Sequence, residues 1–573
     1  MAISDLSPST LSALNSFYLY RIPIPTTMFM PNGFLRSCWV LLWLGGAVMP
    51  TLAQTVDFVP LNHAYRMRLL PGLQAASDSS HHLGVYPLNP FTYGGVRQTF
   101  SAGLRQKGAF ADSTWVGRKL LNDMLIDLQT PDFDLQMHPV LNLQVGRDSR
   151  TPDQTPYINT RGFFLQGRIG PNVAFFSDFY ENQARFPAYI NDWTRDNAYG
   201  GKGVLPGQGA FKNIAGQTNG RDFGYVSGAV SFQASRFFNV QLGYGKQFVG
   251  DGYRSFLLSD NAFNYPYLRI QSNFWKIQYT NLYTQLRDVR FQTVDNIYRR
   301  KYMVAHHLSV KLGDRWRIGL YESVVYADST NTRGLEWDYL VPVIFYRPVE
   351  FALGSEGGNV VLGMNVHYQA ADRLQVYGQI ALDEFKFDEV FAGDGWWANK
   401  YTVQVGAKWQ EPVPGLFVQG EFNFARPYTY THRGGHQAYA HYNQALAHPL
   451  GANFREVVLL ANYYRGRFLA EALLQYSWRG LDPPGENWGS QVMLGYETRE
   501  QEYGNQTLQG VRTTTLFGDL RIGYLVNPSY NLRLEAGLRL REFTPTTSAL
   551  RATQTTFLFV GLRTALQNHY YDF

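Results

Sequence analysis

The feature that most constrains this chain is an alternation of apolar and polar residues that recurs from about residue 134 to the C-terminus. A clear example begins at Leu532, where leucines and one alanine occupy every second position and Arg533, Glu535, Gly537 and Arg539 lie between them. Side chains of a β-strand point alternately to its two faces. This period therefore predicts strands that have one aliphatic face and one charged face.

Two architectures fit such a strand. A soluble sandwich would bury the aliphatic face and show the charges to water, whereas a membrane barrel would turn the aliphatic face to lipid and the charges to a wet lumen. Three features favour the barrel: many strands reach the roughly ten residues needed to span when tilted, aromatic residues cluster at strand ends, and the chain ends in Phe573. Terminal aromatic residues resemble the assembly signal of outer-membrane barrels. We therefore predict an all-β protein, a transmembrane antiparallel β-barrel.

The composition agrees with this prediction. Aromatic residues make up 16% of the chain and glycine occurs 54 times, whereas charged residues are only 17%. Such a mixture favours strands and turns over helices. After the N-terminal region, the sequence contains no run of about twenty consecutive apolar residues, so it predicts no spanning helix. A closed barrel, in which every backbone group is paired between strands, is then the remaining way to cross a membrane.

The lengths of the links between strands also alternate, as they do in barrels with short periplasmic turns and longer external loops. Short links are predicted at 170–172, 234–236, 313–315, 371–373, 411–415, 464–467 and 527–530, and long links near 183–221, 248–266, 328–358, 383–399, 427–455 and 542–555. Nineteen candidate strands are found, but the number of strands must be even if both ends of the barrel chain lie in the periplasm. Eighteen result if 491–498 belongs to an external hairpin, and twenty if a strand is hidden in 499–513. We favour eighteen.

The N-terminus predicts export. Met28 or Met30 is the expected start, Arg36 provides the basic region, and an apolar run covers 38–48. Small residues then place the cleavage point after Ala53, so residues 1–53 are interpreted as a signal peptide. The alternative, a transmembrane anchor, is disfavoured because the run is too short.

The single cysteine, Cys38, lies in the predicted signal peptide, so the mature chain would have neither disulfides nor thiol chemistry. Acidic and basic residues are interleaved, and the net charge of +6 suggests no nucleic-acid partner. Residues 54–133 alternate poorly and are interpreted as a small periplasmic segment or a lumen plug, with one or two helical turns expected at 119–126. The barrel is assigned to 134–573.

Four segments carry a resemblance to a known family. They are LGYGKQF at 242–248 with its continuation GDGYRS, LSDN and PYLR up to residue 269, then DYLVPVIFYRPVE at 338–350, AHPLGANF at 447–454, and the ending GLRT at 561–564 with YYDF at 570–573. Together they sample most of the mature chain. They resemble the Wzi family of capsule-assembly proteins, and among these the RemB-type gliding-motility members.

The resemblance implies an eighteen-strand outer-membrane barrel that helps to retain or assemble capsule polysaccharide, and its RemB-type branch implies a link to gliding motility. The expected location is the bacterial outer membrane, crossed many times, with the lipid as one partner and capsule or exopolysaccharide or motility proteins as others. No cofactor is expected. None of the sugar-contacting residues of the family is transferred to this chain.

Loop 245–269 is the first candidate site. Gly250, Asp251 and Gly252 permit a tight external turn, and the segment combines charges with aromatic rings. Arginine forks suit acidic glycans, and sugar rings pack on aromatic faces. The alternative, which we favour, is that the loop folds inward and its charges satisfy one another across the lumen. The candidate glycan or lumen contacts are Lys246, Asp251, Tyr253, Arg254, Asp260 and Arg269.

Two further candidates lie in external links. Segment 336–350 places Glu336, Asp338, Arg347 and Glu350 around an apolar centre, and Arg347 and Glu350 are taken as candidate contacts. A packed plug or constriction explains this segment without a ligand and is favoured. Trp396 and Trp397 form either a sugar-stacking platform or part of the interfacial aromatic belt, of which the belt is favoured.

Histidines gather near residue 440, but their spacing does not indicate a metal site. His432, His436, His441 and His448 are separated by 4, 5 and 7 residues, which match no usual zinc pattern. A GxSxG elbow, a Walker loop and an HExxH helix are absent from the sequence. We therefore expect a non-enzymatic protein that binds glycan or partners through external loops, with a porin or solute channel as the main alternative and a rim hydrolase as a third.

Overall fold

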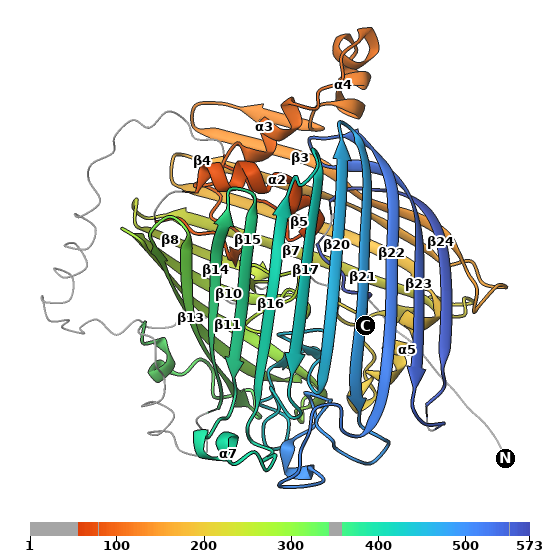
Figure 1. Cartoon of the computed structure of the whole chain (residues 1–573). Helices are drawn as coiled ribbons and strands as arrows, with labels where there is room; N and C mark the ends of the chain where they lie inside the picture. Colours follow the sequence, from red (N-terminus) through yellow and green to blue (C-terminus); the bar gives the residue numbers. More distant parts are fainter. Residues whose placement is uncertain (1–55, 78–79, 343–357, 549, 566) are drawn as a thin grey trace, which may run out of the picture. The chain divides into compact units, whose positions relative to one another are not determined.

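The computed structural model describes residues 56–77, 80–342, 358–548, 550–565 and 567–573. The predicted signal peptide and its cleavage point after Ala53 lie outside these residues. One antiparallel sheet dominates the chain and closes on itself into a barrel (Figure 1). Among the helices of the described part, none is long and apolar enough to span a membrane.

The wall of the barrel has eighteen strands. Their bounds are β3 Phe133–Asp148, β4 Tyr157–Ile169, β5 Val173–Arg185, β7 Gly220–Gln233, β8 Phe238–Gly245, β10 Tyr265–Phe274, β11 Ile277–Gln292, β12 Tyr298–Leu312, β13 Trp316–Asp328, β14 Asn359–Ala371, β15 Leu374–Leu382, β16 Tyr401–Gln410, β17 Leu416–Ala425, β20 Phe454–Arg465, β21 Phe468–Leu481, β22 Val511–Asn527, β23 Leu532–Pro545 and β24 Thr553–Arg563.

Each wall strand pairs with its neighbours in the sequence, and the ring closes where β24 meets β3, from Asn142 opposite Arg563 to Asp148 opposite Phe557. The predicted count of eighteen is thereby confirmed. Segment 491–498 lies in the long link between β21 and β22, as the favoured count requires. Link lengths alternate as predicted, and the rule for such barrels places the short turns in the periplasm and the long loops outside the cell.

The two faces of β23 decide between barrel and sandwich. Leu534 and Leu540 are 57% and 45% exposed on the outer surface, whereas Arg533, Glu535 and Arg539 are at most 5% exposed in the interior. A soluble protein would have the opposite distribution, because exposed leucines face water at a cost while charged groups prefer it. The aliphatic face therefore points to lipid, and the protein is a multi-pass β-barrel of the outer membrane.

Besides the eighteen long wall strands, the described residues form two small two-stranded sheets, β1–β9 and β18–β19, further short strands and helices. They are α2 His63–Ala76, β1 Val85–Tyr86, α3 Val96–Ala102, the π-helix η2 Ala109–Ser113, α4 Trp115–Leu121, β2 Ile126–Gln129, α5 Ala188–Asp196, η3 Tyr199–Gly201, β6 Lys212–Asn213, β9 Phe248–Val249, η4 Trp337–Leu340, α7 Phe387–Ala392, β18 Ala440–His441, β19 Gln444–Ala445 and η6 Tyr496–Thr498.

The helix expected at 119–126 begins and ends earlier than predicted. Helix α4 starts after Thr114, whose hydroxyl accepts a hydrogen bond from the Gly117 N–H at 3.0 Å, and it ends at Leu121. Threonine is a common N-cap because its side chain satisfies a free N–H of the first turn. Ile126 instead begins β2, which pairs with β3 from Ile126 opposite Met137 to Gln129 opposite Asp134.

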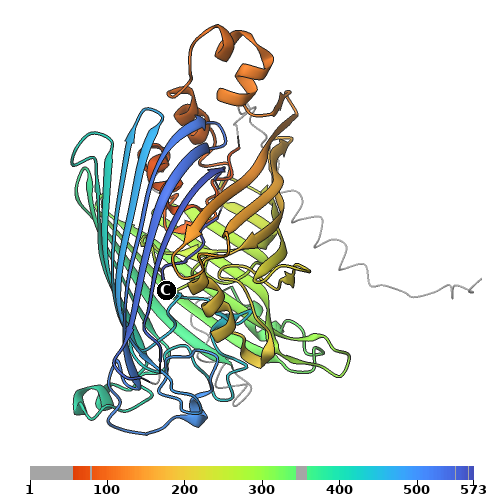
Figure 2. The ribbon, with the colours of Figure 1, turned by 90° about the vertical axis from the view of Figure 1, so that its right-hand side faces the viewer.

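Strand β2 occupies a place in the wall that the end of the chain leaves vacant. One edge of β3 pairs with β4 along 133–145. The other edge of β3 pairs with β2 along 134–137 and with β24 along 142–148. After Arg563 the chain turns inward, and the end of the chain lies within the barrel in both ribbon views (Figures 1 and 2). Phe573 therefore does not belong to the last strand. It packs inside against Trp193, with ring centroids 5.2 Å apart.

The outward aliphatic face gives a direct test of the membrane assignment. Leu520 on β22 is 51% exposed and outward-facing. In the variant Leu520→Arg, a cation would face hydrocarbon, and we expect the free energy of unfolding from lipid vesicles to fall by about 2–4 kcal/mol. Urea titration of the refolded barrel measures this change.

The matched control is Val413→Arg, a position of similar exposure, 55%, in the turn between β16 and β17. That turn lies outside the hydrocarbon, so the control should keep the unfolding free energy of the parent. Equal tolerance of both arginines would contradict a lipid-facing wall.

Candidate functional site

The lumen is filled by three segments that are far apart in the sequence. We call residues 56–103 the N-terminal plug, residues 246–264 the lumen loop and residues 564–573 the C-terminal tail. The plug and the lumen loop pair directly, because β1 and β9 form a two-stranded sheet and the Gly250 N–H donates to the Gly84 oxygen at 2.7 Å. The lumen loop and the tail also form hydrogen bonds with side chains of the wall.

Of the two interpretations of the lumen loop, an external glycan-binding turn and an inward fold, the structure shows the inward fold that the sequence analysis favours. The loop starts at the external end of β8 but folds inward, since its backbone is bound by side chains of the wall. Glu421 of β17 accepts hydrogen bonds from the N–H groups of Tyr253 and Arg254 at 2.8 and 3.1 Å. Gln379 of β15 accepts from the Phe256 N–H at 2.8 Å. Polar wall residues thus replace the water that an external turn would use.

Arg254 lies at the centre of the lumen and is fully buried. Its Nη2 lies 2.8 Å from Oε1 of Glu456 on β20 and 2.9 Å from Oδ2 of Asp572 in the tail. The hydroxyl of Tyr253 also donates to Asp572, at 3.2 Å. We call Arg254, Glu456 and Asp572 the central ion cluster; it connects lumen loop, wall and tail. Burial raises the pKa of Asp572 to about 6, although Arg254 opposes that rise.

Asp251 and Lys246 are paired inside the barrel as well. Asp251 forms a buried salt bridge with Arg317 of β13, and His367 of β14 lies 3.4 Å away. The ammonium of Lys246 donates to two backbone oxygens, those of Gly207 at 2.7 Å and Asp260 at 3.1 Å. Burial lowers the pKa of Lys246 to about 8. Both charges hold the lumen loop in place.

The last two lumen candidates connect the loop to the tail and to the plug. Asp260 accepts hydrogen bonds from the Tyr570 hydroxyl at 2.6 Å and from the Asn568 amide at 2.9 Å. Arg269 lies on β10, beyond the loop, and donates to the Pro87 oxygen of the plug at 2.7 Å. The six candidates of segment 245–269 are therefore contacts within the lumen rather than groups on the outer surface.

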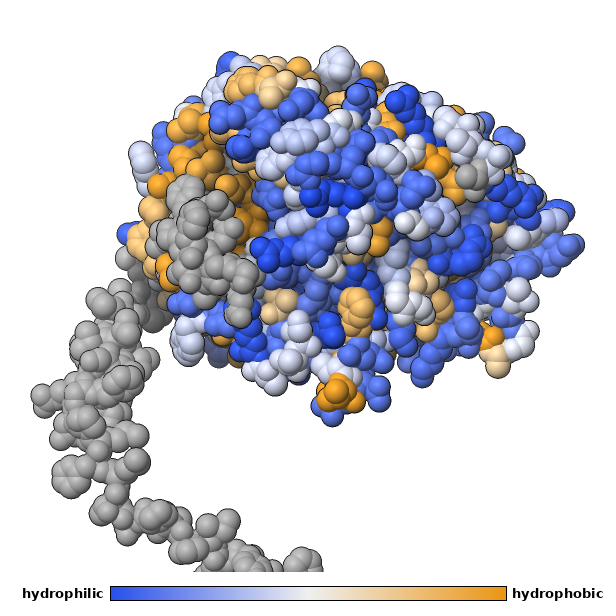
Figure 3. Space-filling model, turned by 90° about the horizontal axis from the view of Figure 1, so that it is seen from below, coloured by the Kyte–Doolittle hydropathy of each residue, from blue (hydrophilic) through white to orange (hydrophobic). Residues whose placement is uncertain are grey.

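Segment 426–453 closes the external side of the lumen. The Ser259 N–H donates to the Leu446 oxygen at 2.8 Å, and the hydroxyls of Tyr430 and Tyr439 donate to backbone oxygens of the lumen loop at 2.6 and 2.7 Å. Hydrophilic side chains cover most of the coloured part of this end of the molecule (Figure 3). We call 426–453 the cap loop.

The histidines of the cap loop have separate partners. His441 accepts from the Arg287 N–H at 2.9 Å and contacts the Asn264 oxygen at 3.1 Å, His436 lies 2.9 Å from Asp288, and His448 lies 2.8 Å from Glu456. Burial lowers the pKa of His441 to about 3 and that of His448 to about 4. Among the described residues, no group of three potential metal ligands comes together.

Trp396 and Trp397 lie in packing between two external loops and not on the lipid-facing wall. Both indole N–H groups donate to one carboxylate oxygen of Glu502, at 3.3 and 2.9 Å. The Trp397 ring packs on Tyr496, with centroids 4.5 Å apart, and the Arg499 guanidinium lies over it at 4.5 Å. Trp396 keeps part of its surface exposed.

Segment 336–350 is described only in its first part. Helix η4 leaves Trp337 83% exposed, while the Tyr339 ring stacks on Tyr326 with centroids 4.8 Å apart. Arg347 and Glu350, the two candidate contacts of this segment, lie outside the described residues.

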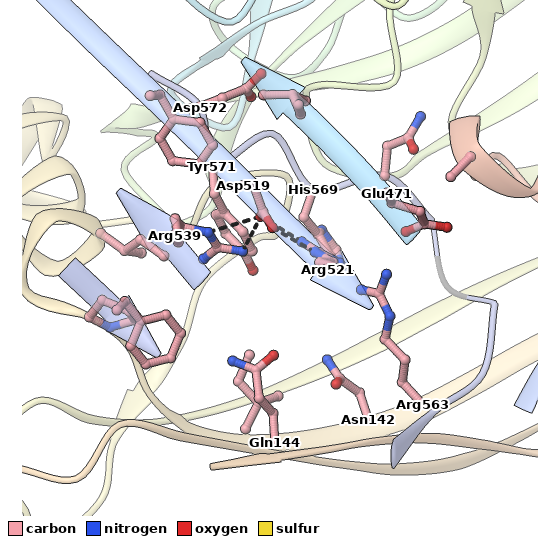
Figure 4. A pocket seen from close by; sticks show the side chains of 18 of the residues that line it. Asn142, Gln144, Glu471, Asp519, Arg521, Arg539, Arg563, His569, Tyr571 and Asp572 are labelled. Carbon is pink, nitrogen blue, oxygen red and sulfur yellow. Dashed lines mark hydrogen bonds and ion pairs between the residues drawn. The ribbon is translucent and has the colours of Figure 1, made fainter. Parts of the chain in front are cut away.

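A network of arginines and carboxylates on the inner wall of β21–β24 was not predicted from the sequence. Its members are Arg521, Arg533, Arg539 and Arg563 with Glu471, Asp519 and Glu535, joined by salt bridges between 2.6 and 3.9 Å long. The charged face of β23 already predicted its arginines and Glu535, but their partners come from neighbouring strands. The network borders a cavity of about 160 Å³ between the wall and the C-terminal tail (Figure 4).

No family model matches the sequence, and no curated protein matches it. Several solved structures are similar at low identity. They include Wzi of Escherichia coli, described as a carbohydrate-binding β-barrel involved in group 1 capsule assembly, at 11% identity and TM-score 0.47 over 90% of this chain and 100% of that one. Others are OccAB2 of Acinetobacter baumannii, at 10% identity and TM-score 0.42 over 75% and 97%, and OprD of Pseudomonas aeruginosa, at 11% identity and TM-score 0.38 over 77% and 96%.

The central ion cluster predicts a large effect of a single substitution. In Arg254→Met, Glu456 and Asp572 would lose the cation that both contact while remaining buried, and we expect the free energy of unfolding to fall by about 3–5 kcal/mol. Urea unfolding of the purified barrel in detergent measures the loss. As a control, Arg195→Met removes an arginine that is 69% exposed and also contacts two carboxylates. Its effect should stay within about 0.5 kcal/mol, and similar losses in both variants would refute the central role of Arg254.

Proposed function

We propose that this protein is a closed outer-membrane barrel that holds or assembles polysaccharide at the cell surface through its external loops, and that it is not a diffusion channel. The filled lumen carries this proposal. A barrel of this strand number is wide enough for an aqueous path. Here the plug, the lumen loop and the tail occupy that path. Buried ion pairs fix the lumen loop and the tail, and the plug is bound to the wall by hydrogen bonds such as that from the Phe58 N–H to Gln166 at 3.0 Å.

The external end has the chemistry that a polysaccharide surface needs. Aromatic side chains are exposed there on Trp337, Phe387 and Phe391, at 83%, 67% and 83%. Flat apolar rings can pack against the C–H faces of sugars, while neighbouring polar groups bind hydroxyls. The half-exposed Trp396 beside Glu502 adds a ring with a polar neighbour. The resemblance of the sequence to capsule-assembly proteins supports the same conclusion.

The proposal extends to attachment of motility partners, because the resemblance includes RemB-type members. In this proposal the protein catalyses no reaction. The solute channel is the second candidate, and the hydrated cavity beside the arginine network is the observation that favours it.

Conductance across a planar bilayer separates the two functions. The complete mature chain should show no large, steady open state, because its lumen is filled. A chain lacking residues 56–100 loses α2, β1 and most of α3 from the lumen and should conduct more than the complete chain, although the lumen loop, the tail and the cap loop remain. A chain lacking residues 107–118 loses only the part around η2 and α4 that projects beyond the barrel (Figure 1), so it should remain closed. A large, steady conductance of the complete chain would reject the proposal in favour of the channel.

Binding of surface polysaccharide extracted from the source cells tests the external face. The variants Trp337→Ala and Phe391→Ala should each weaken binding by the purified barrel by roughly two- to tenfold, since loss of a stacking ring is worth about 0.5–1.5 kcal/mol. Trp275→Ala removes a ring that is 73% exposed in the two-residue turn at the opposite end. That control should bind like the parent. Absence of binding by the parent, together with unchanged surface polysaccharide and motility after gene deletion, would end the proposal.

A further inference from the structure

The cavity beside the arginine network is faced by side chains whose outer polar atoms have no protein partner among the described residues. Arg563 of β24 and Asn142 of β3 lie opposite each other across the closing strand pair, and Gln144 is two residues further along β3. All three head groups point into the cavity (Figure 4). Neither amide has a hydrogen-bond partner among the described residues, and Arg563 contacts only Glu535, through Nε at 3.1 Å.

The charge around Arg563 is incompletely compensated. In the network of β21–β24, Asp519 binds Arg521 and Arg539, while Glu471 and Glu535 bind Arg533. Four arginines thus share three carboxylates, which leaves one positive charge in excess. The two terminal nitrogens of the Arg563 guanidinium form a fork that matches a carboxylate in two parallel hydrogen bonds.

Other groups around the cavity require donors rather than another anion. Asn142 Oδ1 and Gln567 Oε1 are buried amide oxygens without a hydrogen-bond partner among the described residues, and an amide oxygen can only accept. A simple anion offers few protons to such acceptors, whereas the hydroxyl groups of a sugar offer several.

The size and the lining of the cavity fit a small hydrated ligand. Its volume of about 160 Å³ would hold roughly five water molecules at about 30 Å³ each. Rings of Phe186, Phe557 and Tyr571 line it beside the polar groups. The cavity reaches Tyr157 and Arg185, which are partly exposed at the external ends of β4 and β5. A ligand would therefore enter from the cell exterior.

We propose that this cavity is a binding site for a single hydroxylated carboxylate of the sugar-acid class, with Arg563 holding the carboxylate and Asn142 and Gln144 binding hydroxyl groups. The site lies inside the barrel and is distinct from the external face, so it does not rest on the polysaccharide role. The ligand places a negative charge where the network has its excess positive charge.

Calorimetric titration of the complete, detergent-purified chain tests the site, with D-glucuronate and D-galacturonate as probes and D-glucose and inorganic phosphate as comparisons. At least one uronate should bind at least tenfold more tightly than glucose, which lacks the carboxylate, and than phosphate, which lacks the hydroxyl pattern. Equal binding of phosphate and the uronates would overturn the sugar-acid assignment, and absence of uronate binding would overturn the site.

Substitutions of residues that line the cavity test whether the uronate binds there. Arg563→Gln should abolish uronate binding or weaken it more than tenfold, and Gln144→Leu should weaken it severalfold without removing an ion pair. Arg236→Gln makes the same chemical change as the first variant at an exposed periplasmic turn and should bind like the parent. If Arg563→Gln does not fold, Gln144→Leu alone decides. Unchanged uronate binding in folded Gln144→Leu would refute the assignment of this cavity.

Discussion

The hydrogen bonds that join β24 to β3 are the constraint on which the rest of the structure depends. They leave the sheet without a free edge, so every strand can lie in hydrocarbon with its backbone groups paired. Closure separates the lipid outside the barrel from the lumen inside it. The two-residue period of the strands then assigns each side chain to one of these two environments. Outward positions become aliphatic, and inward positions become free to carry charge. A one-residue slip would exchange the two sets, so the register is strongly determined.

Closure also creates an interior too wide for wall side chains to fill. In this chain the filling is made of backbone segments, and each brings N–H and C=O groups that need partners. The inner wall supplies them: Glu421 and Gln379 bind the lumen loop as water would bind an exposed turn. Buried charged groups then occur together with groups of opposite charge. The most enclosed example is Arg254, which lies between Glu456 and Asp572. Breaking one member of such a set leaves the others buried without compensation.

The sequence predicted the wall well because the wall is governed by local rules. Alternation and link length are visible over ten residues, and together they predicted eighteen strands and the place of 491–498. The partners of the lumen segments were not visible in the same way. The composition of Gly250, Asp251 and Gly252 also suits an exposed turn, and their inward fold was favoured only because buried charges need partners. Those partners, Gln379, Glu421 and Arg317, are distant in the sequence and were not predicted. The same holds for Phe573, whose terminal position suggested a strand end.

The candidate site was predicted in part for the same reason. Single charged residues such as Arg539 were evident from one strand, but a cavity is a property of several strands and of the tail that faces them. The plug, the lumen loop and the tail leave a cavity against the wall strands β21–β24, where four arginines face three carboxylates. The head groups of Arg563, Asn142 and Gln144 face this space, and the proposed ligand would supply the hydrogen-bond partners that the packing of the lumen segments does not provide.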